Sequence, residues 1–230
     1  MPIPSQALKG FIYDTVQQEI PVGRKAQKTI WKIEAVRHFE DTVDQIFDSL
    51  KKNGDPSWLE ELCPYFAQVW PSGLKLAQVI SEMDETIWKN QRVLELGGGL
   101  ALPSMILAKA GAEVWVTDSH PDVPIFLEKN MRLNDVPKTL RYQELNWEKS
   151  QTLPVNFDWV IGSDILYDRS HPESLCAALF RQLQPGTKVL IADPGRPYLN
   201  PFLKAVADQL GRNPTVRGNE KEVFLIEFQK

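Results

Sequence analysis

The chain has 230 residues, 43% of them hydrophobic and 24% charged, a balance typical of a globular protein that can bury a full core. Its net charge of −4 and its lack of clustered lysine and arginine predict no nucleic-acid partner, because a sequence-independent grip on DNA or RNA needs a basic patch. No window approaches the roughly 18 consecutive apolar residues of a membrane span, and the N-terminus lacks a signal-peptide pattern, so we expect no membrane partner.

The beginning of the chain differs in character from the rest. Residues 18–22 and 29–34 predict the two strands of a hairpin, and 41–52 predicts an amphipathic helix with apolar residues along one face. We therefore expect 1–60 to be an α+β extension packed on the main domain, which spans 61–230.

From Arg92 onward, short apolar runs alternate with amphipathic segments, which is typical of a parallel sheet flanked by helices. The expected strands are 92–96, 113–117, 140–145, 157–162, 188–192 and 222–228, with a shorter candidate at 214–217. The expected helices are 102–110, 123–133, 172–182 and 200–210. This order predicts an α/β fold with a Rossmann-like, doubly wound sheet.

A glycine-rich loop follows the first of these strands and leads into a helix. Its glycines permit close backbone approach and the helix N-terminus offers free N–H groups, so the arrangement predicts a nucleotide-binding site. A dinucleotide site has a third glycine three residues after the second, where this chain has Leu102. The methyltransferase pattern is an acidic residue followed by Gly-x-Gly-x-Gly. Glu95, Gly97 and Gly99 match it, and Ala101 replaces the last glycine.

Asp118 ends the second strand, 21 residues after Gly97. In a doubly wound sheet a carboxylate at this place can accept hydrogen bonds from both ribose hydroxyls of a bound nucleoside. Asp118 could also cap the turn that follows, and ribose binding fits both cofactor classes. It therefore supports a nucleoside cofactor without choosing one.

The two cysteines, Cys63 and Cys176, lie far apart and show no metal-ligand spacing. Both stand among apolar residues, so we expect buried free thiols, no metal site and a cytoplasmic location.

Three further segments carry a resemblance to a known family. They are Val69–Leu74 with Trp-Pro-Ser-Gly, Leu145–Trp147 with Asn-Trp, and Ser163–Asp168 with Asp-x-x-Tyr. In this order they resemble the protein-lysine methyltransferase branch of the class I, seven-β-strand S-adenosylmethionine-dependent methyltransferases, over roughly residues 64–201. The segment Asp193–Leu199 is also similar to the electron-transfer flavoprotein β-subunit lysine methyltransferases.

The resemblance implies a seven-stranded mixed sheet with an antiparallel last strand, S-adenosylmethionine as cofactor and a protein as substrate. It also implies a set of cofactor-binding residues, with Glu95 orienting the amino-acid end, Asp118 holding the ribose, and Asn146 and Trp147 bordering the adenine. The full set is Trp70, Glu95, Gly97, Gly99, Asp118, Asn146, Trp147 and Ser163. Where this chain has Asn146 the family usually has aspartate, which leaves the contact with adenine open.

Asp164 and Tyr167 are the expected catalytic residues. Methyl transfer is an in-line displacement, so positioning of the acceptor supplies most of the rate. A lysine ammonium, with a reference pKa of about 10.4, must lose a proton before it can attack. We expect Asp164 to bind and orient the amine rather than act as a strong base, and Tyr167 to hydrogen-bond it or face its charge. His171 is a weaker candidate for accepting the proton, because His-Pro is an ordinary turn sequence.

Other functions remain open from the residues alone. The same cofactor could serve a small-molecule acceptor or another protein side chain, since the fold hosts many acceptors. A cofactor-binding interaction module without catalysis is a second alternative, kept open by Ala101 and Asn146. A nicotinamide-dependent enzyme is a distant third.

Overall fold

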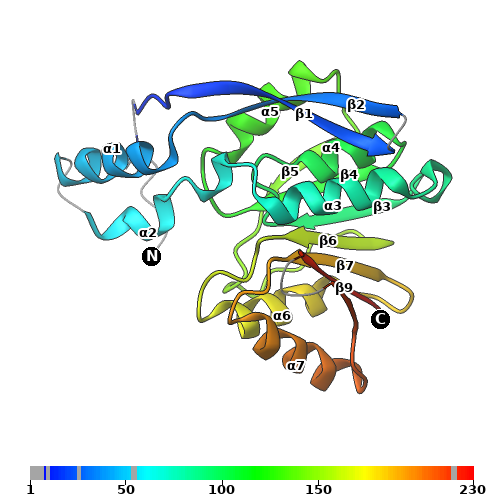
Figure 1. Ribbon diagram of the computed structural model, residues 1–230. Helices are drawn as coiled ribbons and strands as arrows, with labels where there is room; N and C mark the ends of the chain where they lie inside the picture. The colour runs from blue at the N-terminus through cyan, green and yellow to red at the C-terminus, as the bar shows by residue number, and fades with distance from the viewer. Residues whose placement is uncertain (1–7, 9–10, 25–26, 53–55, 219–221) are drawn as a thin grey trace.

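A seven-stranded sheet lies at the centre of the computed structural model, which describes residues 8, 11–24, 27–52, 56–218 and 222–230 (Figure 1). The strand order is β5-β4-β3-β6-β7-β9-β8. The strands are β3 (Arg92–Leu96), β4 (Glu113–Asp118), β5 (Leu140–Glu144), β6 (Trp159–Ser163), β7 (Lys188–Asp193), β8 (Thr215–Arg217) and β9 (Phe224–Gln229). The first five are parallel, whereas β9 runs antiparallel to both β7 and β8. The expected Rossmann-like mixed sheet is confirmed.

Helices cover both faces of this sheet (Figure 1). On one face lie α3 (Pro71–Glu82), α4 (Leu102–Lys109) and α5 (Val123–Leu133), and on the other lie α6 (His171–Gln182) and α7 (Leu199–Leu210). Each face has its own buried cluster, with Met105 in the first and Phe202 in the second. This two-layer burial explains why the central strands read as continuous apolar runs rather than alternating ones.

Helix α3 is the main element that the sequence pattern did not predict. Pro71 stands at its first position, where a missing N–H costs nothing, and Leu76, Ala77 and Ile80 form its buried face. The helix packs against α4, and its N-terminus reaches the carboxyl end of β6. The proline and the apolar spacing together are the signal that would have located it.

The N-terminal region forms a separate hairpin of β1 (Thr15–Arg24) and β2 (Gln27–Val36), followed by α1 (Phe39–Lys52). The hairpin lies over α3 and α5, and it buries Trp31 and Ile33 against them. Burial of such side chains contributes about 1.5–3 kcal/mol each. The predicted hairpin and helix are confirmed, with longer strands than expected, whereas the domain boundary near residue 60 stays a prediction.

Short helical turns connect this region to the main sheet. They are η1 (Pro56–Trp58), α2 (Leu59–Leu62), η2 (Tyr65–Ala67) and, after α3, η3 (Glu85–Ile87).

Both cysteines, Cys63 and Cys176, are free and buried, as predicted. Within the described residues, none of the helices has the length and apolar character needed to cross a membrane.

Candidate active site

A cleft of about 680 Å³ opens at the carboxyl ends of β3, β4 and β6. It is lined by the glycine loop after β3, the first turn of α3, the segment after β5 and the segment after β6. The strand order changes direction between β3 and β6, and ligands of such sheets bind at this switch point. The described residues contain no group of three His, Cys, Asp or Glu side chains that could hold a metal ion.

The glycine loop forms one wall of the cleft in a conformation that suits glycine. Gly97 and Gly99 have φ values of 62° and 51°. A Cβ atom on Gly97 would lie 2.6 Å from Cγ2 of Ile165, and one on Gly99 would lie 2.9 Å from the carbonyl oxygen of Phe66. Side chains are therefore excluded from both positions, and the backbone is left open to a ligand.

Ala101 stands where the methyltransferase pattern has its last glycine. It precedes α4 with a φ of 56°, the left-handed region that costs an L-residue about 1–2 kcal/mol. Alanine is tolerated here because its methyl group is buried in the core of this face of the sheet. The alanine thus adopts the left-handed conformation that glycine would take more easily.

Asp118 holds the glycine loop as well as lining the cleft. Its Oδ2 accepts a hydrogen bond from the Gly99 N–H at 3.1 Å, and its Oδ1 accepts from Ser119 and His120 N–H at 2.8 and 3.0 Å. Burial raises the pKa of this carboxyl, and the three N–H groups oppose that shift. The alternative interpretation of Asp118 as a turn cap is confirmed, and its expected contact with the ribose stays a prediction.

Glu95 does not line the cleft. Its side chain is 1% exposed and accepts a hydrogen bond from Ser104 Oγ, beneath the backbone of Gly98. Burial raises the pKa of Glu95 to about 8, so the carboxyl carries a proton at neutral pH. The side chain points into the core and accepts a hydrogen bond from Ser104 in the first turn of α4, and its expected contact with the amino-acid end of the cofactor stays a prediction.

Asn146 and Trp147 line the far end of the cleft, after β5. The Oδ1 of Asn146 accepts the Glu148 N–H at 2.9 Å, which orients the amide. The Trp147 ring lies close to Gly97, with Cζ2 3.3 Å from the place of a Cβ atom. These positions agree with the expected adenine-binding end, whose contacts stay a prediction.

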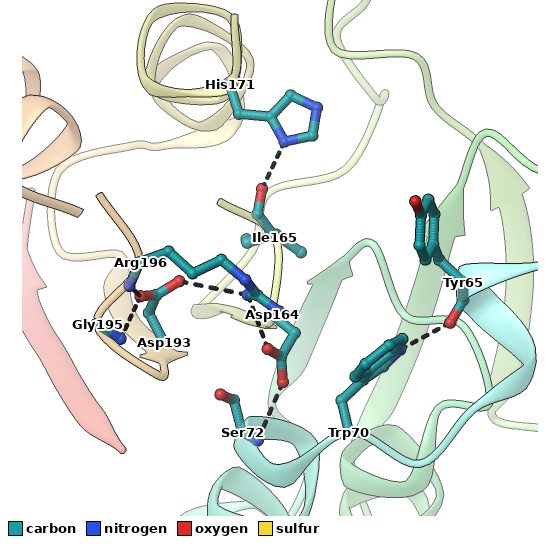
Figure 2. Close-up of polar contacts among 9 residues, drawn as sticks. All are labelled: Tyr65, Trp70, Ser72, Asp164, Ile165, His171, Asp193, Gly195 and Arg196. Atoms are coloured by element: carbon teal, nitrogen blue, oxygen red, sulfur yellow. Dashed lines mark hydrogen bonds and ion pairs between the residues drawn. The ribbon is translucent and has the colours of Figure 1, made fainter. Parts of the chain in front are cut away.

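Trp70 and Ser163 also line the cleft. Trp70 caps α3, is half-buried, and donates its Nε1–H to the carbonyl oxygen of Tyr65 at 2.7 Å (Figure 2). Ser163 ends β6 and lies next to Gly73 of α3. The unpredicted helix α3 therefore brings Trp70 to the site.

Asp164 follows β6 with a φ of 57° and is 8% exposed. Its Oδ2 accepts the Ser72 N–H of α3 at 3.0 Å, and its Oδ1 lies 2.8 Å from Nη1 of Arg196 (Figure 2). Both oxygens are therefore engaged. A cationic acceptor can reach this carboxylate only by sharing it with the guanidinium or by displacing the guanidinium, a contact that the sequence alone did not indicate.

Tyr167 stands at the mouth of the cleft and is 49% exposed. Its ring centroid lies 5.6 Å from that of Tyr65 and 4.4 Å from that of His171. Desolvation, followed by the nearby Asp118, raises the pKa of the phenol, so Tyr167 carries its proton at neutral pH and can donate a hydrogen bond.

His171 also lines the cleft, although the sequence favoured an ordinary turn. Its Nδ1 lies 2.9 Å from the Ile165 carbonyl oxygen (Figure 2), and its ring packs edge-on against Trp147 and Tyr167. Burial lowers the pKa of the imidazole, so the neutral ring donates from Nδ1 and keeps Nε2 as an acceptor. The site thus gains a polar group that the sequence analysis set aside.

Comparison with known proteins adds an independent observation. A family model described as lysine methyltransferase matches residues 62–206. The histone-arginine methyltransferase METTL23 of Rattus norvegicus is 30% identical over 148 residues, which cover 59% of this chain and 64% of that protein. The electron transfer flavoprotein beta subunit lysine methyltransferase of Xenopus laevis is 33% identical over 135 residues, covering 58% and 53%. The matched regions span less than two thirds of these relatives.

Among solved structures, the Thermus thermophilus 16S rRNA N2 G1207 methyltransferase RsmC, in complex with AdoMet and guanosine, superposes with a TM-score of 0.60. The sequences are 14% identical, and the match covers 94% of this chain and 51% of that one. At this identity the likeness shows a shared fold and carries nothing about the acceptor.

Proposed function

The chain belongs to the lysine methyltransferase family, and we propose that it transfers a methyl group from S-adenosylmethionine to a lysine side chain of a protein. One observation carries the proposal: a single cleft joins the glycine loop after β3 to Asp164 and Tyr167 after β6. Such a cleft can hold a nucleoside cofactor at one end and an amine at the other.

The residues at the cofactor end fit S-adenosylmethionine. Gly97 and Gly99 would approach the amino-acid portion by backbone, Asp118 would accept from the ribose, and Asn146 with Trp147 would border the adenine. The fit rests on the left-handed backbone of the two glycines, which lines the cleft without a side chain. When bound, the cofactor supplies a methyl group on a positively charged sulfur.

At the acceptor end, the side chains suit an amine. The Asp164 carboxylate attracts the lysine ammonium and orients its nitrogen, which must then lose a proton to attack. Tyr167 can hydrogen-bond that nitrogen, and Tyr65 beside it offers an aromatic face to the cation. The neutral Nε2 of His171 is a nearby acceptor for the released proton.

Arginine is the second candidate acceptor, because one of the relatives is named a histone-arginine methyltransferase. A guanidinium already lies beside Asp164 as Arg196, so a carboxylate–guanidinium contact is sterically allowed here. We favour lysine because the family model and the other relative reported above carry that name. A reducing cytoplasm is also proposed as the location, supported by the free thiols of Cys63 and Cys176.

The proposal is tested by incubating the protein with methyl-labelled S-adenosylmethionine and an extract of its host. We expect label in a discrete protein band with the wild type and its loss with Asp164→Asn. Asp208→Asn is the matched control, because Asp208 forms only an exposed ion pair with Lys204. Label that enters only small molecules, or that persists with Asp164→Asn, would refute the proposal. Calorimetry with NAD and S-adenosylmethionine separates the two cofactor classes.

A further inference from the structure

Three charged side chains meet behind the acceptor end of the cleft, where β6 and β7 end. The Arg196 guanidinium lies between Asp164 and Asp193, with Nη1 2.8 Å from Oδ1 of Asp164 and 3.9 Å from Oδ2 of Asp193 (Figure 2). Asp164 is 8% exposed and Asp193 is 0% exposed. Two buried carboxyl groups therefore share one guanidinium, and its closer contact is with Asp164.

Asp193 is well held on one oxygen and poorly satisfied on the other. Its Oδ1 accepts the Gly195 N–H at 2.7 Å and the Arg196 N–H at 3.0 Å. Its Oδ2 is buried and receives no hydrogen bond from the described part of the chain. Burial raises the pKa of this carboxyl, and the Gly195 and Arg196 N–H groups and the nearby guanidinium oppose that shift. A buried acceptor without a donor is costly, so such an atom calls for an explanation.

The guanidinium itself is not locked onto Asp164. Although Nη1 of Arg196 lies 2.8 Å from that carboxylate, it lacks the alignment of a hydrogen bond to any described residue. The side chain is 28% exposed and lines the cleft. A movement of about 1 Å would bring it within hydrogen-bond distance of Asp193. Because the Arg196 main chain is already bound to Asp193, the loop need not move.

We propose that Arg196 is a displaceable counter-ion, which neutralises Asp164 before the acceptor binds and moves onto Asp193 when the acceptor's ammonium group takes Asp164. This inference rests on the proposed function, because it takes the acceptor to be a cationic side chain. With the ammonium in place, each carboxylate has one cation. Arg196 and Asp193 are then positioning residues, since they act on the acceptor through Asp164.

The arrangement selects among acceptors by charge. A neutral acceptor would leave one of two buried carboxylates without a cation after Arg196 moved, which is unfavourable in a poorly hydrated site. A cationic acceptor avoids that cost. The backbone N–H of Ser72 keeps the Asp164 carboxylate in place through the exchange.

The test uses n-butylammonium as the probe for a lysine side chain and 1-butanol as its neutral counterpart. The ¹⁵N-labelled protein, with S-adenosylhomocysteine bound to prevent transfer, is titrated while the Nε–H signal of Arg196 is followed. Asp193→Asn is the informative variant, because its Oδ1 still accepts the two loop N–H groups while its amide cannot hold the guanidinium. Asp208→Asn is the surface control.

We expect n-butylammonium to shift the Arg196 signal saturably in the wild type and in Asp208→Asn, and 1-butanol to leave it unchanged. In Asp193→Asn the apparent dissociation constant should rise about tenfold, as expected for loss of one charged hydrogen bond. An Arg196 signal that ignores n-butylammonium, or that responds equally in Asp193→Asn, would overturn the proposal.

A kinetic measurement separates this inference from the proposed function. With the labelled acceptor protein as substrate, Asp193→Asn should raise KM about tenfold and change kcat much less, because acceptor binding is the affected step. A fall confined to kcat would contradict the counter-ion exchange. Absence of any labelled protein would refute the proposed function, whereas the shift of the Arg196 signal would still report the exchange.

Discussion

The two ends of the cleft are built in different ways. The cofactor end is built mainly on backbone, with Gly97 and Gly99 in left-handed conformations and the Gly99 N–H bound to Asp118. The acceptor end consists of side chains, with Asp164 held between the N-terminus of α3 and Arg196. The backbone geometry of the glycine loop depends mainly on residues close in sequence. The contacts of the Asp164 carboxylate join distant segments, since Ser72 stands 92 residues before it in the chain.

This difference between the two ends determines how far each can change by substitution of its residues. A backbone cradle fits one cofactor and tolerates few substitutions, because any Cβ atom at its glycines meets other atoms. A side-chain network can change its acceptor through single residues while the fold is kept. Relatives named for lysine and for arginine substrates are consistent with such a division.

The largest effect is expected at Asp164. Asp164→Asn keeps an acceptor for the Ser72 N–H but removes the charge that holds the ammonium, so methyl transfer should fall at least about a hundredfold. Binding of S-adenosylmethionine should be nearly unchanged, because the cofactor end is built from other residues. Initial rates and calorimetry measure the two properties. If Asp164→Asn lowered the transfer rate and the cofactor affinity equally, the two ends of the cleft would not be built from separate residues.

A second prediction concerns the core beneath the cofactor end. The pKa of Glu95 is raised to about 8 in the folded protein by burial, so folding favours the protonated acid. Its contribution is fully present below the unfolded pKa near 4.5 and is lost as pH rises toward 8. Wild-type stability should therefore fall relative to Glu95→Gln by up to about 1.4 kcal/mol per pH unit between pH 5 and 7.

Urea denaturation of both proteins at pH 5, 6 and 7 measures this difference, because other titrating groups are common to the pair. If the free energies of unfolding of wild type and Glu95→Gln changed equally with pH, Glu95 would be ionised in the folded protein. That result would return it to the set of charged groups near the cofactor.

A third prediction tests the backbone cradle. Gly99→Ala would bring a Cβ atom within 2.9 Å of the Phe66 carbonyl oxygen, so affinity for S-adenosylmethionine should fall about tenfold or more. Gly211→Ala is the matched control, because Gly211 also has a positive φ, 69°, but has nothing within 4 Å. It should lose about 1 kcal/mol of stability and no affinity. Equal affinity losses would point to strain rather than contact.

The smallest effect is expected at Tyr167. Tyr167→Phe keeps the aromatic face beside Tyr65 and removes one hydroxyl at a half-exposed position, so transfer should fall only about three- to tenfold. Rates at saturating and at low acceptor concentrations show whether the loss lies in kcat or in kcat/KM. A drop as large as that of Asp164→Asn would make the hydroxyl a principal catalytic group.

The strands, most helices and the glycine loop could be predicted because their signals are local. Apolar runs, glycines and Asp118 each follow from residues adjacent in the chain. Arg196 could not be assigned to Asp164, since nothing in the spacing of two separate loops indicates a contact at 2.8 Å. At Glu95 a motif predicts the residue type, whereas the direction of the side chain depends on Ser104 in the next helix.

The most direct test of the central claim is identification of the methylated residue by mass spectrometry of the labelled protein band. We predict methyl-lysine in a defined protein, present with the wild-type enzyme and absent with Asp164→Asn. Methyl-arginine at that band, or methyl groups recovered only in small molecules, would contradict the assignment of this cleft to protein-lysine methylation.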